Sequence, residues 1–417
     1  MYPITVYVRP SAPPVNPAHE ALSRARMRLS RALHPVRTAR YKASRWVRRM
    51  FTSVPGIEPR PLGELQLPGV SIVRHIVAAA GSRELPLPVS LDGDTHPFFR
   101  TRAVYPEFRR CLARMKGARI HGPDGFLYLP DGRVLVENHF FFRDHIENHD
   151  LYFERLPEPR RIEGSVFPLV GFCPAAHYHW MTEVLYRLHG CLDDLPSDLR
   201  FLVPSRASGV HREALRAFGI DAGRILEMSV EDHFVFDELW YASPISKSGY
   251  ETPEAARWVR DRFAAYADAR ATSPTAARPE KVYITRRLAK RRRIVNEQEL
   301  IDLLESAGFH CVECERLSFL QQAETFSRAT VVVAPHGAGL VNLLFAPLGG
   351  SLLEIYPEEI PMGATCYWSL ANALGWSYRY LRGSVSGLAD DSSDISVSIP
   401  HVRRWLERSE SKRGGVG

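Results

Sequence analysis

A regular alternation of apolar, β-branched runs with amphipathic segments constrains the fold of this 417-residue chain more than any other feature. The alternation extends over residues 281–382, where runs typical of strands are separated by segments with helical spacing. The expected strands are residues 281–285, 310–315, 330–334, 351–356 and 378–382, and the expected helices are 296–307, 318–328, 339–345 and 366–374. Strands separated by helices of this length predict an α/β fold with a parallel, doubly wound sheet.

The chain before this region divides into further segments. Residues 65–170 show short strand-like runs with frequent Pro, Gly and Asp, and residues 177–269 again alternate between helical and strand patterns. The Ala/Thr/Ser/Pro-rich stretch 271–279 is the best candidate for a linker. We therefore expect four parts, which are a basic extension at 1–60, an N-terminal α/β domain at 61–270, a C-terminal Rossmann-like domain at 280–385, and a tail at 386–417 whose helix returns to the N-terminal domain.

Composition is that of a soluble globular protein, with 45% apolar and 24% charged residues. No stretch reaches the roughly 18 uninterrupted apolar residues of a membrane span, and the N-terminus lacks the apolar centre of a signal peptide. Six scattered cysteines do not suggest a disulfide framework. These features predict a cytoplasmic location.

Positive charge is concentrated near the N-terminus. Residues 17–50 hold ten Arg or Lys against one acidic residue, Glu20, and their net +9 exceeds the +7 of the whole chain, so the remainder carries −2. Apolar residues are interleaved with these charges, which is typical of a helix that lies on anionic lipid. A nucleic-acid arm lacks an accompanying binding module. The alternatives are a solvated basic extension and peripheral attachment to the inner face of a membrane.

The segment most informative about function follows the expected strand at 330–334. The strand breaks at Pro335 into a turn of His336, Gly337, Ala338 and Gly339, after which a helix begins. In open α/β sheets, ligands bind at the carboxyl ends of strands, and small residues let a phosphate approach the free N–H groups of the next helix. This turn predicts an anion site, although a bonded structural histidine in a plain strand-to-helix turn is the alternative reading of His336.

An ordered set of motifs over about residues 175–357 resembles the glycosyltransferase family 61 group, which includes capsular-polysaccharide-type enzymes. The matching residues are His179-Trp180 with Glu183, Tyr283-Ile-Thr-Arg286-Arg287, Arg293-Ile-Val-Asn296-Glu297, Leu317-Ser318-Phe319, Gln322, Phe326, Ala329, His336-Gly-Ala-Gly-Leu-Val-Asn342-Leu-Leu-Phe345 and Leu353-Glu354-Ile355. The resemblance implies a GT-B architecture, in which two Rossmann-like domains face a cleft. It also implies inverting transfer of a hexosyl or pentosyl group from a nucleotide-sugar donor.

The resemblance places a donor site in the C-terminal half. Its expected residues are Arg286, Arg287, Arg293, Asn296, His336, Gly337, Ala338, Gly339, Asn342 and Glu354. Guanidinium groups suit bidentate phosphate contacts and can replace a metal beside a leaving diphosphate. Each polar residue has a structural alternative: a surface ion pair for the arginines, an N-cap for Asn296, a backbone bond for Asn342, and an ion pair with an arginine instead of ribose binding for Glu354. Lys290, Arg291 and Arg292 are expected to be solvated.

The N-terminal half is expected to hold the acceptor and the catalytic base. His179 and Glu183 are spaced i, i+4 on one helix face, so either can take the proton of an acceptor hydroxyl, with His336 as a further catalytic candidate. A plain helix-surface pair is the alternative, and a metal site of His177, His179 and Glu183 is disfavoured because no Asp-x-Asp pair follows any of the expected strands. Cys311 and Cys314 fall in an expected strand, which favours a structural role over zinc or redox chemistry.

The sequence therefore predicts a glycosyltransferase that needs no metal cofactor. Its partners would be a nucleotide-sugar donor and a saccharide or lipid-linked saccharide acceptor in surface or capsular polysaccharide assembly, without nucleic acid. The alternative is a catalytically inert protein of the same fold that binds sugar nucleotides or glycans. Phosphoryl transfer is disfavoured, because the chain has no Gly-Lys-Ser/Thr phosphate loop.

Overall fold

The computed structural model of the chain describes a defined set of residues. They are 56–58, 60–77, 83–105, 109–138, 156–171, 173–174, 176–246, 248–270, 278–360, 365–385 and 393–413. All of them lie within one of the two compact units of the chain, formed by Pro55–Asn148 and Leu156–Gly417. Most of the basic extension, most of the expected linker and residues 386–392 of the tail lie outside the described residues, so the predictions made for them stay predictions.

The C-terminal region contains a parallel six-stranded sheet in the order β13-β12-β14-β15-β16-β3, and every neighbouring pair is parallel. Its strands are β12 (Lys281–Ile284), β13 (His310–Val312), β14 (Val331–Pro335), β15 (Ser351–Tyr356), β16 (Ser377–Arg382) and β3 (Val89–Ser90). The predicted parallel sheet is confirmed. The edge strand β3 comes from far upstream, and its two residues were too few to show a periodic pattern.

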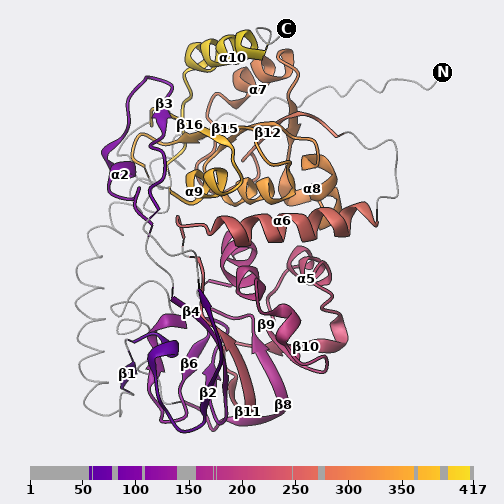
Figure 1. Cartoon of the computed structure of the whole chain (residues 1–417). Coiled ribbons are helices and arrows are strands. Elements are labelled where there is room, and N and C mark those ends of the chain that lie inside the picture. The colour runs from indigo at the N-terminus through magenta and orange to yellow at the C-terminus, as the bar shows by residue number, and fades with distance from the viewer. Residues whose placement is uncertain are drawn as a thin grey trace, which may run out of the picture. The chain divides into compact units, whose positions relative to one another are not determined.

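Helical segments connect these strands largely as predicted (Figure 1). They are α7 (Glu297–Ser306), η8 (Cys314–Arg316), α8 (Phe319–Phe326), η9 (Ala338–Phe345) and α9 (Thr365–Ala373). Helix α10 (Ile399–Arg413) follows the last strand and, instead of returning to the N-terminal domain as expected, places its buried Val402 and Trp405 in a hydrophobic cluster with Leu300 of α7. A capping box begins α8, with reciprocal bonds between Ser318 and Gln321. The strand expected at 310–315 ends at Val312, because the chain turns into η8 and buries Cys314.

The other sheet has ten strands of mixed direction, in the order β1-β7-β6-β5-β11-β8-β9-β10, while β4 pairs with β11 and β2. Its strands are β1 (Ile57–Glu58), β2 (Val70–Val77), β4 (Arg109–Met115), β5 (Arg119–His121), β6 (Phe126–Tyr128), β7 (Val134–Leu135), β8 (Arg160–Pro168), β9 (Arg200–Pro204), β10 (Ile225–Met228) and β11 (His233–Ala242). Strands β11, β8, β9 and β10 are mutually parallel, whereas β4 and β5 run antiparallel to β11.

The helices of this region include one departure from expectation. They are η1 (Leu62–Glu64), α2 (Pro97–Arg100), η2 (Val136–Asn138), α4 (His177–His179), η4 (Trp180–Val184), η5 (Leu185–Leu188), η6 (Leu192–Asp194), α5 (Gly209–Arg216), η7 (Ala222–Arg224) and α6 (Pro253–Asp268). The helix expected to carry His179 and Glu183 is a series of short turns that includes the π-helical turn η4. Such wide turns re-aim side chains and are frequent at functional sites.

Helix α6 joins the two sheets into one packed structure. Its Phe263 ring lies 5.1 Å from Phe319 of α8 and 5.3 Å from Phe345 of η9, measured between ring centroids. Arg260 of the same helix donates from Nε to the Ala346 carbonyl at 3.0 Å. One hydrophobic cluster accordingly contains buried residues from both regions. The α4–α5 segment and the turn after β14 therefore belong to a common core.

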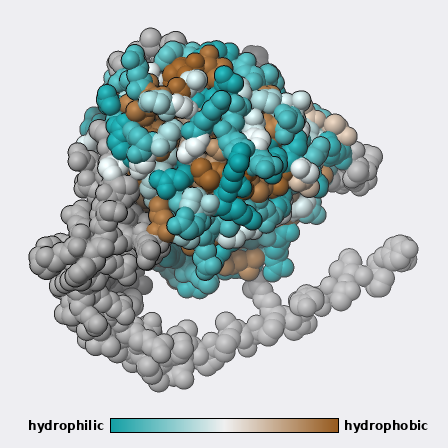
Figure 2. Space-filling view, turned by 90° about the horizontal axis from the view of Figure 1, so that it is seen from below, coloured by the Kyte–Doolittle hydropathy of each residue, from teal (hydrophilic) through white to brown (hydrophobic). Residues whose placement is uncertain are grey.

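On the face of the protein that Figure 2 shows, hydrophobic residues form separate patches among hydrophilic ones. Within the described ranges, no helix is long and apolar enough to cross a membrane. The two sheets and their helices together form a mixed α/β fold, as the sequence predicted.

Candidate functional site

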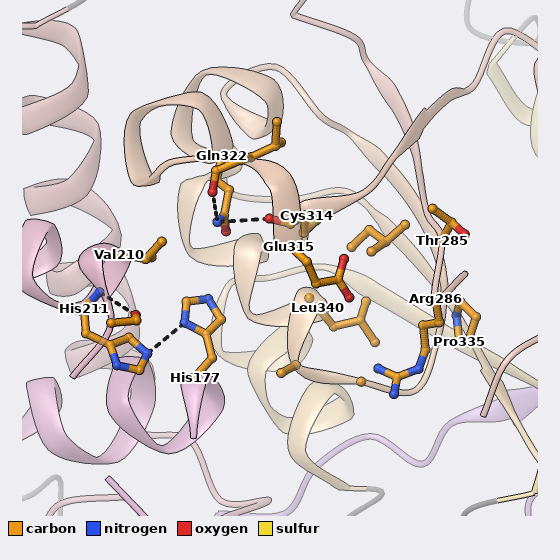
Figure 3. A pocket seen from close by; sticks show the side chains of 16 residues that line it. His177, Val210, His211, Thr285, Arg286, Cys314, Glu315, Gln322, Pro335 and Leu340 are labelled. Atoms are coloured by element: carbon orange, nitrogen blue, oxygen red, sulfur yellow. Dashed lines mark hydrogen bonds between the residues drawn. The ribbon is translucent and has the colours of Figure 1, made fainter. Parts of the chain in front are cut away.

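A pocket of about 310 Å³ lies at the carboxyl ends of β12 and β14 and also touches α4 and α5. Figure 3 shows His177 and His211 on one side, Arg286, Thr285 and Pro335 on the opposite side, and Gln322 nearer to the histidines. The lining residues are His177, Ser208, Val210, His211, Ile284, Thr285, Arg286, Cys314, Glu315, Leu317, Gln322, Pro335, Gly337, Ala338, Gly339 and Leu340. Four residues predicted to bind the donor, Arg286 and the three small residues of the turn, come together here.

Arg286 is held directly against the glycine turn. A Cβ atom at Gly337 would lie 1.8 Å from Nη1 of Arg286, so any other residue here requires the guanidinium to move. The Nε and Nη2 atoms donate to the Arg291 carbonyl at 3.3 and 3.1 Å. Burial and the neighbouring charge of Arg292 lower the pKa of Arg286. No carboxylate of the described residues forms an ion pair with Arg286, so its charge is available to an anion.

The partial burial of Arg292 could not be foreseen from the sequence. It was expected to be solvated, but it is half-buried and adopts a φ of 55°, and its buried Nε has no hydrogen-bond partner in the part of the chain that the structure describes. Its charge acts on both Arg286 and Tyr367. A left-handed backbone is uncommon at a non-glycine residue, and no sequence signal marks that conformation here.

The turn after β14 exposes backbone donors. The Leu340 N–H closes the first helical turn onto the Gly337 carbonyl at 3.0 Å. Ala338 and Gly339 precede that bond at the start of η9, where N–H groups have no acceptor within the helix. Gly337 itself is extended, with φ 172°, so its glycine is required by the approach of Arg286 and not by backbone strain.

His336 points away from the lining of this pocket into a buried polar network. Its Nδ1 lies 2.5 Å from Oε1 of Glu354, and its ring stacks on Tyr356 with centroids 5.2 Å apart. The Tyr378 hydroxyl donates to Oε2 of Glu354 at 2.7 Å. The Glu354 side chain is fully buried and its partner is a histidine, which differs from both roles considered for it from the sequence. The carboxylate that lines the pocket is Glu315.

Three other predicted donor residues lie elsewhere. Arg287 is 53% exposed, faces Glu297 at 3.7 Å, and borders a separate cavity beside β13. Arg293 pairs with Asp394 at 2.6 Å. Asn296 precedes α7 without capping it through its side chain, and its amide instead exchanges two 2.9 Å hydrogen bonds with the backbone of Val397. The structure brings none of these three side chains to the pocket, and two of them fasten the C-terminal segment.

Asn342 and the cysteine pair also pack inside the protein. Asn342 is fully buried in η9 and donates from Nδ2 to the Cys314 sulfur at 3.3 Å, instead of to the backbone. Cys311 belongs to β13, whereas Cys314 belongs to η8. Burial raises the pKa of both thiols, to about 11 and about 12. Among the residues that the structure describes, no three His, Cys, Asp or Glu side chains are placed to hold a metal ion.

His179 and Glu183 form the i, i+4 pair that the sequence predicted. Nδ1 of His179 lies 3.0 Å from Oε1 of Glu183, and the Ser248 hydroxyl donates to the same oxygen at 2.5 Å. The pair does not line the pocket. The Tyr367 ring lies between this segment and His336. Its centroid is 5.4 Å from that of His336 and 5.5 Å from that of Tyr178, the residue before His179.

The α4–α5 wall of the pocket carries two stacked histidines. The rings of His177 and His211 lie 5.4 Å apart and nearly parallel, and His211 stacks in turn on the buried Trp180. Burial lowers the pKa of His177 to about 4, and burial together with His177 lowers that of His211 to about 3. Both are therefore neutral at pH 7. His211 was missed from the sequence because its partner is 34 residues away.

Residues 177–353 match the family model described as Glycosyltransferase 61. The match includes every residue that lines the pocket. It confirms the resemblance inferred from the ordered motifs.

Curated relatives align with shorter parts of the chain. An EGF domain-specific O-linked N-acetylglucosamine transferase of Drosophila melanogaster is 37% identical over 100 residues, covering 23% of this chain and 18% of the relative. The Xenopus laevis protein of that name is 33% identical over 103 residues, covering 24% and 19%. A protein O-linked-mannose beta-1,4-N-acetylglucosaminyltransferase 2 of Danio rerio is 29% identical over 134 residues, covering 29% and 22%. The chain thus spans about a fifth of the length of these relatives.

Proposed function

From the premise that residues 177–353 form a glycosyltransferase 61 domain, we propose that this chain transfers a sugar from a nucleotide donor to a glycan acceptor. The observation that carries the proposal is the guanidinium of Arg286, which lies against Gly337 in a pocket at the ends of two parallel strands and has no carboxylate partner among the described residues. Relatives named as N-acetylglucosaminyltransferases support the same reaction class.

The donor diphosphate is proposed to bind between Arg286 and the turn after β14. A phosphate there receives hydrogen bonds from the guanidinium and from the N–H groups of Ala338 and Gly339. Fixed cations and helix-terminal donors stabilise the negative charge that grows on the leaving diphosphate, which is the role a divalent metal plays in other transferases. Glu315, the carboxylate in the pocket lining, is suited to accept hydrogen bonds from the ribose hydroxyls.

Transfer is proposed to occur by one displacement with inversion. The acceptor hydroxyl attacks the anomeric carbon, the bond to the diphosphate breaks, and the hydroxyl proton passes to a base. We assign that base to His179, because Glu183 lies 3.0 Å from its Nδ1 and can orient the ring and stabilise its protonated form. His336, oriented in the same manner by Glu354, is assigned to the donor side.

The proposed architecture is GT-B, with the C-terminal sheet holding the donor and the N-terminal region holding the acceptor. The support for it is a pocket whose lining comes from both regions. A saccharide acceptor in surface polysaccharide assembly remains part of the proposal. Attachment to a membrane through the basic extension stays a prediction, because that segment lies outside the described residues.

The test compares two adjacent arginines. Release of nucleoside diphosphate from a panel of nucleotide sugars is measured with and without chelator for the wild type, Arg286→Ala and Arg287→Ala. We expect Arg286→Ala to lose about 100-fold in turnover, because a charge-assisted phosphate contact disappears in a site partly shielded from water. Arg287→Ala should stay within about twofold, since that side chain is exposed and faces another cavity.

Wild-type turnover by a folded Arg286→Ala protein would contradict the donor site. Binding of nucleotide sugars without release of nucleoside diphosphate would instead identify an inert binding protein. Loss of activity with chelator would show that a metal takes part.

A further inference from the structure

Three buried polar atoms that have no hydrogen-bond partner among the described residues belong to side chains that line the same pocket as Arg286. They are Oε1 of Gln322, Nε2 of His177 and Nδ1 of His211. Gln322 is only 4% exposed and His211 only 3%. Buried polar atoms in native proteins nearly always have partners, so several unpaired ones around one cavity indicate that a ligand completes them.

The orientation of the Gln322 amide is fixed by the protein. Its Nε2 donates to the Leu317 carbonyl at 3.0 Å and to the Cys314 carbonyl at 3.4 Å. Because both donors are used, the remaining atom, Oε1, is an acceptor. It therefore requires an N–H or O–H donor from whatever occupies the pocket.

The outer ring nitrogens of the two histidines can act as hydrogen-bond donors or acceptors. Nδ1 of His177 lies 3.3 Å from Nε2 of His211, so one of these nitrogens donates to the other. Both rings are neutral, since burial lowers both pKa values. If His177 donates, its outer Nε2 is an acceptor and the outer Nδ1 of His211 is a donor. If His211 donates, the two outer roles are exchanged. The pair can thus offer either a donor or an acceptor.

The pocket lining also includes apolar side chains. Val210, Leu317 and Leu340 line the pocket together with Gln322 and the two histidines. In Figure 3 the histidines lie across the pocket from Arg286, and Gln322 lies on their side of it. Such a surface suits a flat, neutral group with hydrogen-bonding edges and not a second phosphate.

We infer that Gln322 and His177 recognise the nucleobase of the donor, with Oε1 of Gln322 accepting a hydrogen bond from an N–H of the base. This inference rests on the proposed function, because it assumes that the diphosphate lies at Arg286. It assigns base selection to a surface built from α4, α5 and α8, and phosphate binding to the ends of β12 and β14.

The experiment separates base recognition from phosphate recognition. Binding of UDP, dTDP, CDP, GDP, ADP and inorganic pyrophosphate is measured by titration calorimetry on the full chain. We expect Gln322→Met and His177→Phe to weaken the tightest nucleoside diphosphate by about 10- to 100-fold, because each removes a buried hydrogen bond. Both variants should bind pyrophosphate as the wild type does, whereas Arg286→Ala should weaken both ligands.

Gln321→Met serves as the matched control. It makes the same substitution on the same helix and breaks the capping box, but it does not touch the pocket lining. If Gln322→Met fails to fold, His177→Phe, which keeps the stacked ring, carries the test. Unchanged affinity of the tightest nucleoside diphosphate for the folded variants would overturn base recognition and leave the diphosphate site standing. Loss equal to that of Gln321→Met would also overturn it. Absence of any nucleoside diphosphate binding by the wild type would overturn both proposals.

Discussion

The two walls of the pocket differ in charge. The wall formed by the ends of β12 and β14 carries the guanidinium of Arg286, which has no carboxylate partner among the described residues and is influenced by the charge of Arg292. The wall formed by α4 and α5 carries His177 and His211, which burial keeps neutral. A ligand with a charged end and a neutral, hydrogen-bonding end satisfies both walls. A nucleoside diphosphate is such a ligand, whereas a simple inorganic anion would use only one wall.

The largest predicted effect concerns the cationic wall. Gly337→Ala places a Cβ atom on Nη1 of Arg286 and must displace the guanidinium from the turn. We expect nucleoside diphosphate affinity to fall about 100-fold, measured by titration calorimetry, since the guanidinium loses its phosphate contact. Gly223→Ala is the control, because a Cβ there meets no atom within 4 Å. Equal affinities of the two variants would mean that Arg286 is not a phosphate ligand.

The second prediction is that the neutral wall, through His177, makes the protein less stable in acid. The folded protein takes up a proton at His177 only near a pKa of about 4, whereas the unfolded chain does so near 6.5. Between these values the unfolded state holds more protons, so the free energy of unfolding decreases as pH falls from 6.5 to 4. The contribution of His177 is at most about 1.4 kcal/mol per pH unit.

Denaturant unfolding of the wild type and of His177→Phe across this range checks the second prediction. The variant should lose less stability with acid than the wild type. If the stability of both proteins changed with pH in the same way, His177 would have an ordinary pKa, and burial would not be what keeps this wall neutral.

The smallest effect is expected outside the pocket. Asn296→Ala removes two hydrogen bonds to Val397 and should lower the free energy of unfolding by about 1–2 kcal/mol. Nucleoside diphosphate affinity should stay within about twofold, because the side chain fastens the C-terminal segment and does not line the pocket. A large loss of affinity with unchanged stability would return Asn296 to the donor site.

The parallel sheet and the glycine turn could be predicted because their signals are local. The β-branched run before Pro335 and the small residues after it specify a strand, a turn and a helix within a few positions. The position of Arg286 relative to Arg287 could not be predicted. Adjacent residues leaving a strand point to different sides, and nothing in their chemistry says which side holds the pocket.

Other site residues could not be placed from the sequence, because their contacts are with residues far away along the chain. Arg293 and Asn296 contact residues 101 positions away, and a sequence pattern does not reveal such partners. Likewise, Glu354 ends the predicted strand, but its burial against His336 and Tyr378 depends on tertiary packing. The residues that could be assigned from the sequence were those whose role follows from the backbone of their own segment.

A crystal structure of the chain with a bound nucleoside diphosphate tests the central claim most directly. We expect diphosphate oxygens within hydrogen-bond distance of the Arg286 guanidinium and of the Ala338 or Gly339 N–H, with the base directed toward Gln322. A diphosphate bound elsewhere, with the turn after β14 free of ligand, would contradict it.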